Sequence, residues 1–204
     1  WGATISNWLA HDHPKTCSAI HINCLTMRHP EGPKTQEEKD WEIKFNKDQI
    51  MQDGYRTQQA TKPQTLSYGM MDSPVGVAAW ILEKFYFWSD IKDNNIESSY
   101  SKDTLLANIM VYIVTKTFNT ASWIYYGRRE EGGRFFSKDF HRIEVPTAAA
   151  LFPAEMSAWP PRSYADRIFN IKRWTKMSKG GHFAALEEPD LLVNDIRVFA
   201  KTLR

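Results

Sequence analysis

The sequence is poor in cysteine. Its 204 residues include only Cys17 and Cys24, which are too few and too close together for a disulfide framework. Cys24 lies in the apolar run "SAIHINCL", so we expect a small, buried side chain at this position. This cysteine usage favours a reducing compartment, and we expect a cytoplasmic protein.

The chain also lacks an excess of one charge and a long hydrophobic run. Its 26 basic and 24 acidic residues leave a net charge of +2 without a basic stripe, which gives no electrostatic case for nucleic-acid binding. The most apolar stretch, residues 74–88, is interrupted by Glu83 and Lys84 and is shorter than the roughly 20 residues that span a bilayer. We therefore expect no transmembrane segment within this sequence, and a membrane anchor before residue 1 stays open.

What is present is an ordinary globular composition, with 42% hydrophobic and 25% charged residues. The length corresponds to one large domain or to a domain with an inserted lid. Stretches rich in β-branched and aromatic residues predict strands, and apolar residues at helical spacing predict helices. We expect strands over 18–25, 141–152 and 171–178, and flanking helices over 2–10, 160–169 and 187–203.

The middle of the chain is predicted to be almost wholly helical over residues 36–117, after a Pro- and Gly-containing boundary at 26–35. The motif "DSPVGVAAW" is a strong start signal for one of these helices. Asp72 or Ser73 would cap it, and Pro74 would occupy the first turn, where a missing N–H costs nothing.

The order of elements predicts an α/β fold, because strands that alternate with helices form a mostly parallel sheet with helices on both faces. The helical block then reads as a cap inserted between two sheet strands. We expect core at 1–27, cap at 28–118 and core again at 119–204. Three strands are too few to bury both faces of such a sheet, so we expect the N-terminal strands to lie outside this chain.

Two chemically useful side chains follow two of the predicted strands. Glu155, in "LFPAEMS", comes after the strand at 141–152, and His182, in "KGGHFAA", comes after the strand at 171–178. The carboxyl ends of neighbouring parallel strands converge on the crevice where ligands bind. Acid first and histidine second is also the order of the α/β-hydrolase triad, in which the nucleophile lies upstream of both. The alternative is a solvated loop carboxylate and a capping histidine.

Three long motifs sharpen this prediction. The stretches "DSPVGVAAWILEKFYFWSD", "VPTAAALFPAE" and "GGHFAALEEPDLLVNDIRVF" occur in the order found in the microsomal-type epoxide hydrolase family, which the chain resembles from Trp1 to Arg204. That resemblance implies an α/β-hydrolase core with an inserted helical cap. It also implies that Glu155 is the acid and His182 the base of a catalytic triad.

The family resemblance places the nucleophile just outside the chain. In the family, the turn before the first helix reads "GGDWG" and its Asp is the nucleophile, whereas this sequence begins at Trp1 with "WGATIS". The resemblance therefore implies an Asp immediately before Trp1, together with an earlier "HGWPG"-like oxyanion loop. It also implies that the backbone N–H of Trp1 helps to hold an oxyanion.

Two cap tyrosines complete the implied site. In the family they donate to the epoxide oxygen, and by motif they fall on Tyr55 in "DGYRTQQATKPQT" and Tyr126 in "ASWIYYGRR". Tyr125 stays open as an alternative to Tyr126. Gly127 departs from the Lys or Glu that the family shows more often. Tyrosine suits this role because its phenol stays protonated at neutral pH.

The resulting prediction is hydrolysis of an apolar epoxide to a vicinal diol through an ester on Asp, without a cofactor or metal. The expected partners are the epoxide, water and the preceding segment of the same protein, and a homodimer stays open. A dehalogenase of the same fold and a non-catalytic binder of apolar ligands are the alternatives. The motif "HDH" at 11–13 lies on a loop without a nearby ligand partner, so we expect no metal there.

Overall fold

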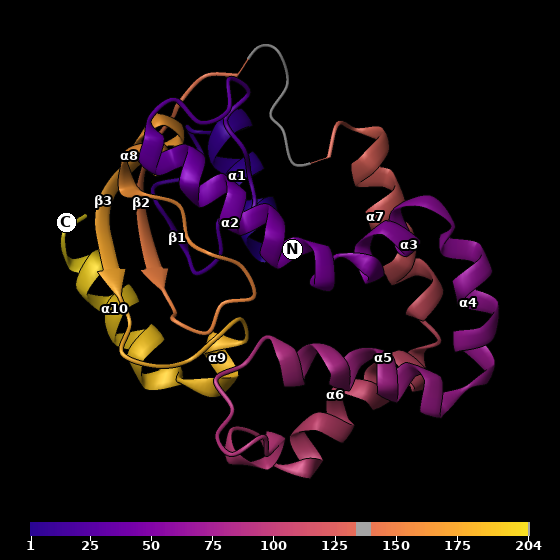
Figure 1. Ribbon diagram of the computed structural model, residues 1–204. Coiled ribbons are helices and arrows are strands. Elements are labelled where there is room, and N and C mark those ends of the chain that lie inside the picture. The colour runs from indigo at the N-terminus through magenta and orange to yellow at the C-terminus, as the bar shows by residue number, and fades with distance from the viewer. Residues whose placement is uncertain (134–139, 204) are drawn as a thin grey trace. The chain divides into compact units, whose positions relative to one another are not determined.

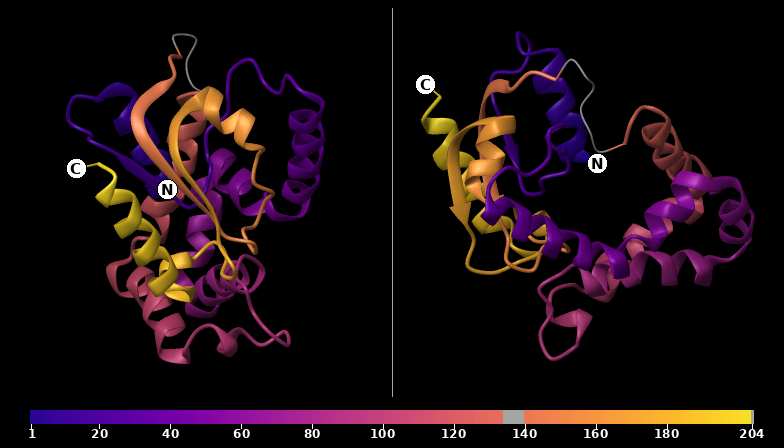
Figure 2. Two further views of the ribbon diagram at one scale, coloured as in Figure 1. Left: turned by 90° about the vertical axis from the view of Figure 1, so that its left-hand side faces the viewer. Right: turned by 45° about the horizontal axis from the view of Figure 1, so that its top comes forward.

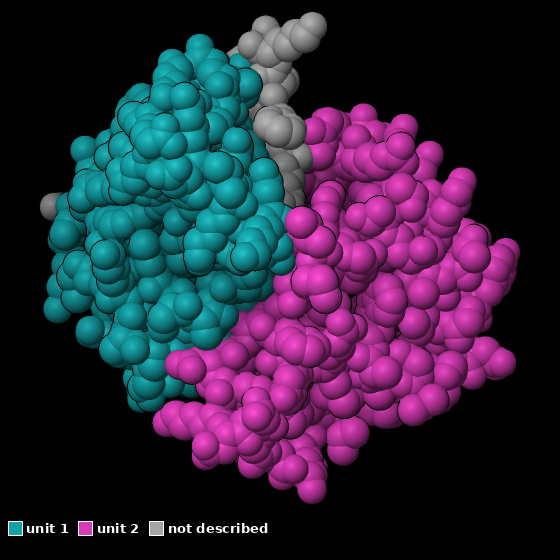
Figure 3. All heavy atoms as spheres, viewed as in Figure 1, with its two compact units in different colours: residues 1–48, 134–204 teal, residues 49–133 magenta. Residues whose placement is uncertain are grey.

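The computed structural model describes residues 1–133 and 140–203, which divide into two compact units. Unit 1 contains residues 1–48 and 134–204, and unit 2 contains residues 49–133 (Figure 3). Unit 2 begins and ends later in the chain than the cap expected at 28–118. It begins within the last part of a helix at residues 36–52 and extends to residue 133. The role of unit 2 as a cap stays a prediction.

Unit 1 holds a parallel sheet of three strands in the order β1-β2-β3 (Figure 1). The strands are β1 (Ile20–Ile22), β2 (Ile143–Leu151) and β3 (Phe169–Lys176). Its helices are α1 (Gly2–Asp12), α2 (Gln36–Gln52, shared with unit 2), α8 (Arg162–Ile168), α9 (Ala184–Glu187) and α10 (Pro189–Lys201). The expected parallel sheet with covering helices is therefore confirmed, and the views in Figure 2 show the same strands from two further directions.

The two faces of the sheet pack against different helices. On one face, Ile143, Val145 and Ala149 belong to a cluster that also contains Ala10 of α1 and Ile168 of α8. On the other face, Ala150 packs with Ala184 of α9 and Leu192 of α10. Successive strand residues point to opposite faces, so a run of small apolar residues in β2 serves both layers. Burial on both faces explains why "VPTAAALF" is almost continuously apolar.

Asp195 of α10 connects two strands across the sheet. Its carboxylate accepts hydrogen bonds from Nε2 of His21 at 2.9 Å and from Nε of Arg173 at 2.7 Å. His21 and Arg173 both pair with Ala148 of β2, so Asp195 spans the sheet from β1 to β3. Burial raises the pKa of Asp195, but hydrogen bonds from Arg173, His21 and Thr175 outweigh it and leave the pKa below its usual value.

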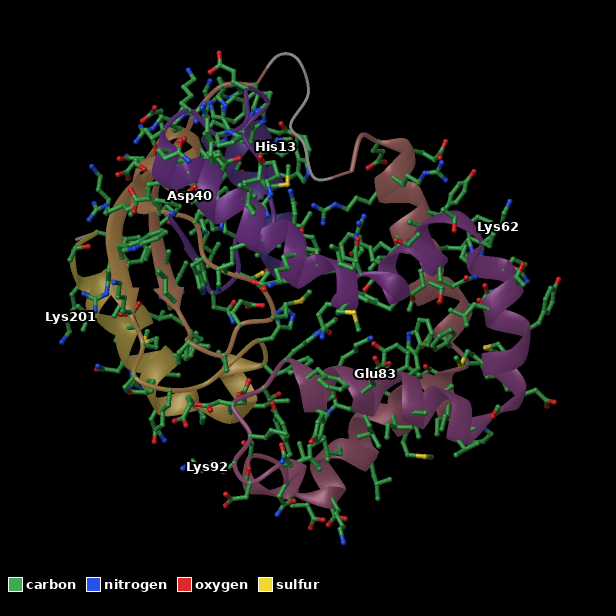
Figure 4. All side chains as sticks on the ribbon, viewed as in Figure 1. His13, Asp40, Lys62, Glu83, Lys92 and Lys201 are labelled. Atoms are coloured by element: carbon green, nitrogen blue, oxygen red, sulfur yellow. The ribbon has the colours of Figure 1, made fainter. Side chains whose placement is uncertain are left out.

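The named elements of unit 2 are all helical. They are α3 (Gly54–Thr61), α4 (Pro63–Asp72), α5 (Pro74–Phe87), the 3₁₀ turn η1 (Ile96–Ser98), α6 (Lys102–Thr115) and α7 (Phe118–Glu130). Lys62, labelled in Figure 4, joins α3 to α4. Val77, Ile109 and Phe118 form the buried centre of the unit. Among the described residues of the whole chain, no helix is both long and apolar enough to cross a bilayer.

Two prolines divide the predicted helical block. Pro63 and Pro74 each occupy a first helical position, where the preceding residue leaves helical geometry. Ser73 is the cap of α5 and accepts a hydrogen bond from the N–H of Gly76, whereas Asp72 ends α4. Of the two caps that the sequence allowed, the serine is thus the one used.

Two other boundaries differ from expectation. The strand predicted at 18–25 is only Ile20–Ile22, because only these residues find ladder partners, from Thr147 to Ala149. The helix predicted at 187–203 is interrupted at Glu188, which precedes Pro189 and takes a φ of −139° and a ψ of 60°. The proline ring disfavours helical geometry at the residue before it, so α9 ends and α10 begins there.

Candidate active site

Glu155 and His182 lie side by side at the carboxyl ends of β2 and β3. The Nδ1 atom of His182 is 2.8 Å from Oε1 and 3.1 Å from Oε2 of Glu155. The Glu155 side chain is 3% exposed, while that of His182 is 28% exposed. The carboxylate is therefore buried behind the imidazole, and the imidazole keeps access to solvent.

The backbone holds the two loops in register. Beyond β2 and β3, Ala154 and Gly181 form a parallel bridge, and the N–H of Ala154 donates to the carbonyl of Gly180 at 3.1 Å. The N–H of Met177 likewise donates to the carbonyl of Leu151 at 2.9 Å. The hydrogen-bonded pairing of β2 and β3 thus continues beyond the ends of the strands, almost to Glu155 and His182.

Gly180 makes the close approach of the His182 loop possible. Its φ is +98°, a conformation that residues with a side chain rarely adopt. A Cβ at this position would lie 2.8 Å from Cδ1 of Phe152 and 3.0 Å from Cγ of Glu188. The first glycine of "GGHFAA" is therefore required both by backbone conformation and by space.

The segment after Glu155 is held by helix α2. The indole N–H of Trp41 donates to the carbonyl of Ala158 at 2.9 Å, and the N–H of Ala158 approaches the carboxylate of Asp48 at 3.4 Å. The N–H of Met156 donates to Oε1 of Glu155 at 2.9 Å. These contacts fix the loop and add a second hydrogen bond to the carboxylate that faces His182.

A third reactive side chain lies beside this pair. One ligand atom from each of Cys24, Glu155 and His182 lies within 4.8 Å of the other two. Cys24 is partly exposed and lines a small pocket with Glu155 and Arg28, so the expectation of a buried core cysteine was wrong. The short strand β1 ends at Ile22, two residues before Cys24, so Cys24 lies at the same carboxyl edge of the parallel sheet as the two loops. No signal in the sequence indicated this position, because the strand was predicted over 18–25 and therefore included Cys24.

The predicted cap tyrosines lie in unit 2. Tyr55, in the first turn of α3, packs edge-on against Trp88 at 5.1 Å and against Tyr125 at 5.8 Å between ring centroids. Tyr126 packs instead against Trp123 at 5.4 Å. Neighbouring residues of a helix point in directions about 100° apart, so the two tyrosines of α7 face different surroundings. Of the two tyrosines of α7, Tyr125 is thus the one that packs against Tyr55, and the role of Tyr126 stays a prediction.

Trp1 and the "HDH" motif lie at the two ends of α1. Trp1 is the N-cap residue of this helix, and its carbonyl accepts the N–H of Ile5 at 3.0 Å. Nδ1 of His11 is 2.6 Å from the carboxylate of Asp12, and its ring stacks on His141 at 4.0 Å. His13, labelled in Figure 4, is the C-cap residue. The role of the Trp1 N–H in an oxyanion hole stays a prediction.

Comparisons with known proteins agree on one family. The chain is 34% identical over 207 residues to a putative epoxide hydrolase of Stigmatella aurantiaca, covering 100% of this chain and 46% of that protein. It is 37% identical over 155 residues to epoxide hydrolase 1 of Sus scrofa, covering 74% of this chain and 34% of that protein. No protein-family model matches the chain.

The solved structures give the same result. The juvenile hormone epoxide hydrolase of the silkworm Bombyx mori superposes with a TM-score of 0.84 and 26% identity, covering 100% of this chain and 53% of that structure. The chain thus spans about half the length of this structure, and about half or less of the two relatives above. The parallel sheet with covering helices is the corresponding part of an α/β-hydrolase core. The chain therefore belongs to the epoxide hydrolase family.

Proposed function

We propose that the protein containing this chain hydrolyses apolar epoxides to vicinal diols, with His182 as the base that activates water. The observation that carries the proposal is the 2.8 Å contact between Nδ1 of His182 and the buried Glu155 carboxylate. A histidine oriented in this way keeps its other ring nitrogen for proton transfer. The names of the relatives support the reaction class.

The proposed first half-reaction forms an ester. A carboxylate that is not part of this chain, expected from an Asp immediately before Trp1, attacks one carbon of the epoxide. The carbon–oxygen bond breaks, and the departing oxygen takes a proton from a tyrosine hydroxyl. Such covalent catalysis replaces one difficult displacement by two easier steps. Tyr55 and Tyr126 are the proposed donors, and the edge-on packing of Tyr125 and Trp88 against Tyr55 would hold the Tyr55 ring.

The proposed second half-reaction releases the diol. His182 takes a proton from water, and the resulting hydroxide attacks the carbonyl carbon of the ester. The backbone N–H of Trp1 is one proposed donor to the oxyanion that forms. The carbon–oxygen bond of the ester then breaks, and the departing alkoxide takes the proton from His182 and leaves as the diol. The remaining proton of the attacking water passes from the new carboxylic acid to the tyrosinate, which restores the carboxylate and the tyrosine. No metal or cofactor takes part in these steps.

Glu155 has an orienting role in this proposal. Its carboxylate accepts the N–H of Met156 and faces Nδ1 of His182, so it selects the tautomer with a proton on Nδ1. The same negative charge stabilises the imidazolium that forms when His182 takes the water proton. Burial strengthens this interaction, because the Glu155 side chain is only 3% exposed.

The test is to trap the ester in the full-length protein. His182→Gln removes the base but leaves the nucleophile and the tyrosines unchanged. After mixing with an apolar aryl epoxide, intact-protein mass spectrometry should show the mass of one added substrate, while steady diol production falls by about 10³-fold or more. Unchanged diol production without an adduct would contradict the proposal.

A further inference from the structure

We infer that Cys24, Glu155 and His182 form a binding site for a soft divalent metal ion such as Zn²⁺, and that an ion bound there inhibits the enzyme. The binding site follows from geometry and donor chemistry alone. The inhibitory effect rests on the proposed function, because it depends on His182 being the base.

The three side chains come from the ends of three adjacent strands. Cys24 follows β1, Glu155 follows β2 and His182 follows β3, and these strands are neighbours in one parallel sheet. The convergence is therefore fixed by the fold and does not depend on one flexible loop. All three residues lie in unit 1.

The distances suit a tetrahedral ion after a small adjustment. Sulfur and nitrogen ligands lie about 2.3 and 2.0 Å from Zn²⁺, so neighbouring ligand atoms in a tetrahedral site are roughly 3.3–3.8 Å apart. In the structure, the three ligand atoms lie within 4.8 Å of one another. Side-chain rotations that move the ligand atoms of Cys24 and His182 by about 1 Å would bring the three atoms to these distances.

The donor set selects the class of ion. One thiolate, one imidazole and one carboxylate are typical ligands of Zn²⁺ and related soft or borderline ions, whereas Mg²⁺ and Ca²⁺ require oxygen ligands. Three protein ligands also leave a fourth position for water, and both Cys24 and His182 are partly exposed. The N–H of Met156 supplies an outer partner that fixes the Glu155 carboxylate.

Either mode of histidine ligation would remove the base. If Nε2 binds the ion, its lone pair is no longer available to take a proton from water. If Nδ1 binds the ion, the 2.8 Å contact that orients the ring against Glu155 is replaced by a metal bond. Binding also releases the thiol proton of Cys24, since the thiolate is the ligand form.

The experiment compares metal binding and inhibition in the full-length protein and two cysteine variants. Calorimetry with Zn²⁺ measures affinity, and Co²⁺ reports thiolate ligation through its sulfur-to-metal charge-transfer band. Cys24→Ser should weaken Zn²⁺ binding by roughly 100-fold or more, since losing an outer-shell partner alone costs about 10–100-fold. Cys17→Ser is the matched control, because Cys17 is also partly exposed and its Sγ donates to the carbonyl of Ala19 in its own loop, away from the site.

Inhibition should follow the same pattern. Zn²⁺ should inhibit the unmodified protein and Cys17→Ser at similar concentrations, reversibly on addition of a chelator. Cys24→Ser should need roughly 100-fold more Zn²⁺ when each protein is compared with its own uninhibited rate. Equal Zn²⁺ affinity in Cys24→Ser and the unmodified protein would overturn the inference. A Co²⁺ spectrum of the unmodified protein without a thiolate band would overturn it independently of any variant.

The outcomes separate this inference from the proposed function. Binding that depends on Cys24, in a protein without epoxide hydrolysis, would support the metal site and contradict the proposed reaction. Hydrolysis that is insensitive to Zn²⁺, with no Cys24-dependent binding, would leave the reaction standing and overturn the metal site.

Discussion

Nδ1 of His182 lies 2.8 Å from Oε1 of Glu155, although the two residues are 27 positions apart in the chain. The separation is bridged by one helix, α8, and one strand, β3, which together return the chain to the same edge of the sheet. A helix that connects two paired parallel strands places their carboxyl ends side by side. The contact therefore follows from the topology.

The charge of Glu155 should matter for turnover. Glu155→Gln keeps the size of the side chain but removes the negative charge that stabilises the imidazolium. We expect kcat to fall by about 10²–10⁴-fold, in line with the loss of the orienting acid in other triads, with a smaller change in KM. Steady-state kinetics on an apolar epoxide measures both. Glu144→Gln is the control, since Glu144 lies on β2, the strand that precedes Glu155, where its side chain is 68% exposed and contacts Arg142. Equal effects of the two substitutions would contradict the account.

Variants of the tyrosines of unit 2 distinguish an epoxide hydrolase from a dehalogenase. Tyr55→Phe and Tyr126→Phe each remove a proposed proton donor, and we expect each to slow ester formation by about 10²–10⁴-fold. The double variant should lose nearly all epoxide opening, whereas a halide leaving group needs no such donor. Rapid-mixing measurements of ester formation test this directly.

Tyr125→Phe is the matched control for the tyrosines. Tyr125 packs edge-on against Tyr55, and a phenylalanine ring preserves that contact. We expect it to retain far more ester formation than Tyr126→Phe. If Tyr125→Phe were the more damaging change, the second donor would be Tyr125 and the assignment by motif would be wrong.

Gly180 should be essential for the geometry of the His182 loop. Gly180→Ala adds a Cβ 2.8 Å from the Phe152 ring at a φ of +98°. The strained conformation costs about 1–2 kcal/mol and the steric overlap about 1–3 kcal/mol, so we expect a loss of roughly 2–5 kcal/mol in the free energy of unfolding. Gly32→Ala has a similarly positive φ but open space, and it should cost only about 1–2 kcal/mol. Denaturant titrations of both variants provide the comparison, and equal losses would refute the packing argument.

Asp195 should stabilise the sheet in a pH-dependent way. Asp195→Asn leaves Arg173 and His21 without their common anion, and we expect a loss of about 2–4 kcal/mol at neutral pH. This is below the roughly 3–5 kcal/mol of a fully buried pair, because the Arg173 side chain is 30% exposed. Asp190→Asn, an exposed position in the first turn of α10, should change the free energy of unfolding by less than about 0.5 kcal/mol.

The sign of the pH effect follows from the lowered pKa of Asp195. The ionised carboxylate is favoured in the folded state, so its contribution is complete above the usual Asp pKa of about 3.9 and is lost as the pH falls through the lower folded value. The difference between the unmodified protein and Asp195→Asn should therefore shrink below about pH 4. A difference that stays constant from neutral to acidic pH would contradict this role.

Much of the architecture was predictable because it depends on local signals. Pro74 and the preceding Ser73 mark the start of α5, and the apolar run before Glu155 is typical of a strand buried on both faces. The ends of elements that depend on tertiary pairing were harder to predict from the sequence. The length of β1 is set by its partners in β2, and no property of residues 18–25 alone reports them.

The site was predictable to a similar extent. The placement of Glu155 and His182 after two strands was sufficient to expect them at one edge of the sheet. Cys24 was missed because its apolar neighbours suggested the core, although the residue lies just beyond a strand that ends early. The orientation of Tyr125 and Tyr126 depends on the rotation of α7 within unit 2, and a motif that is ambiguous by one residue cannot supply that rotation.

The most direct test of the central claim is a single turnover of the full-length protein in ¹⁸O-labelled water, with enzyme in excess over epoxide. The account predicts that the first diol carries no label and that the label appears in a carboxylate of the enzyme, because the water activated by His182 attacks the ester carbonyl. Label in the first diol, with none in the protein, would mean that water attacks the epoxide directly and would contradict the account.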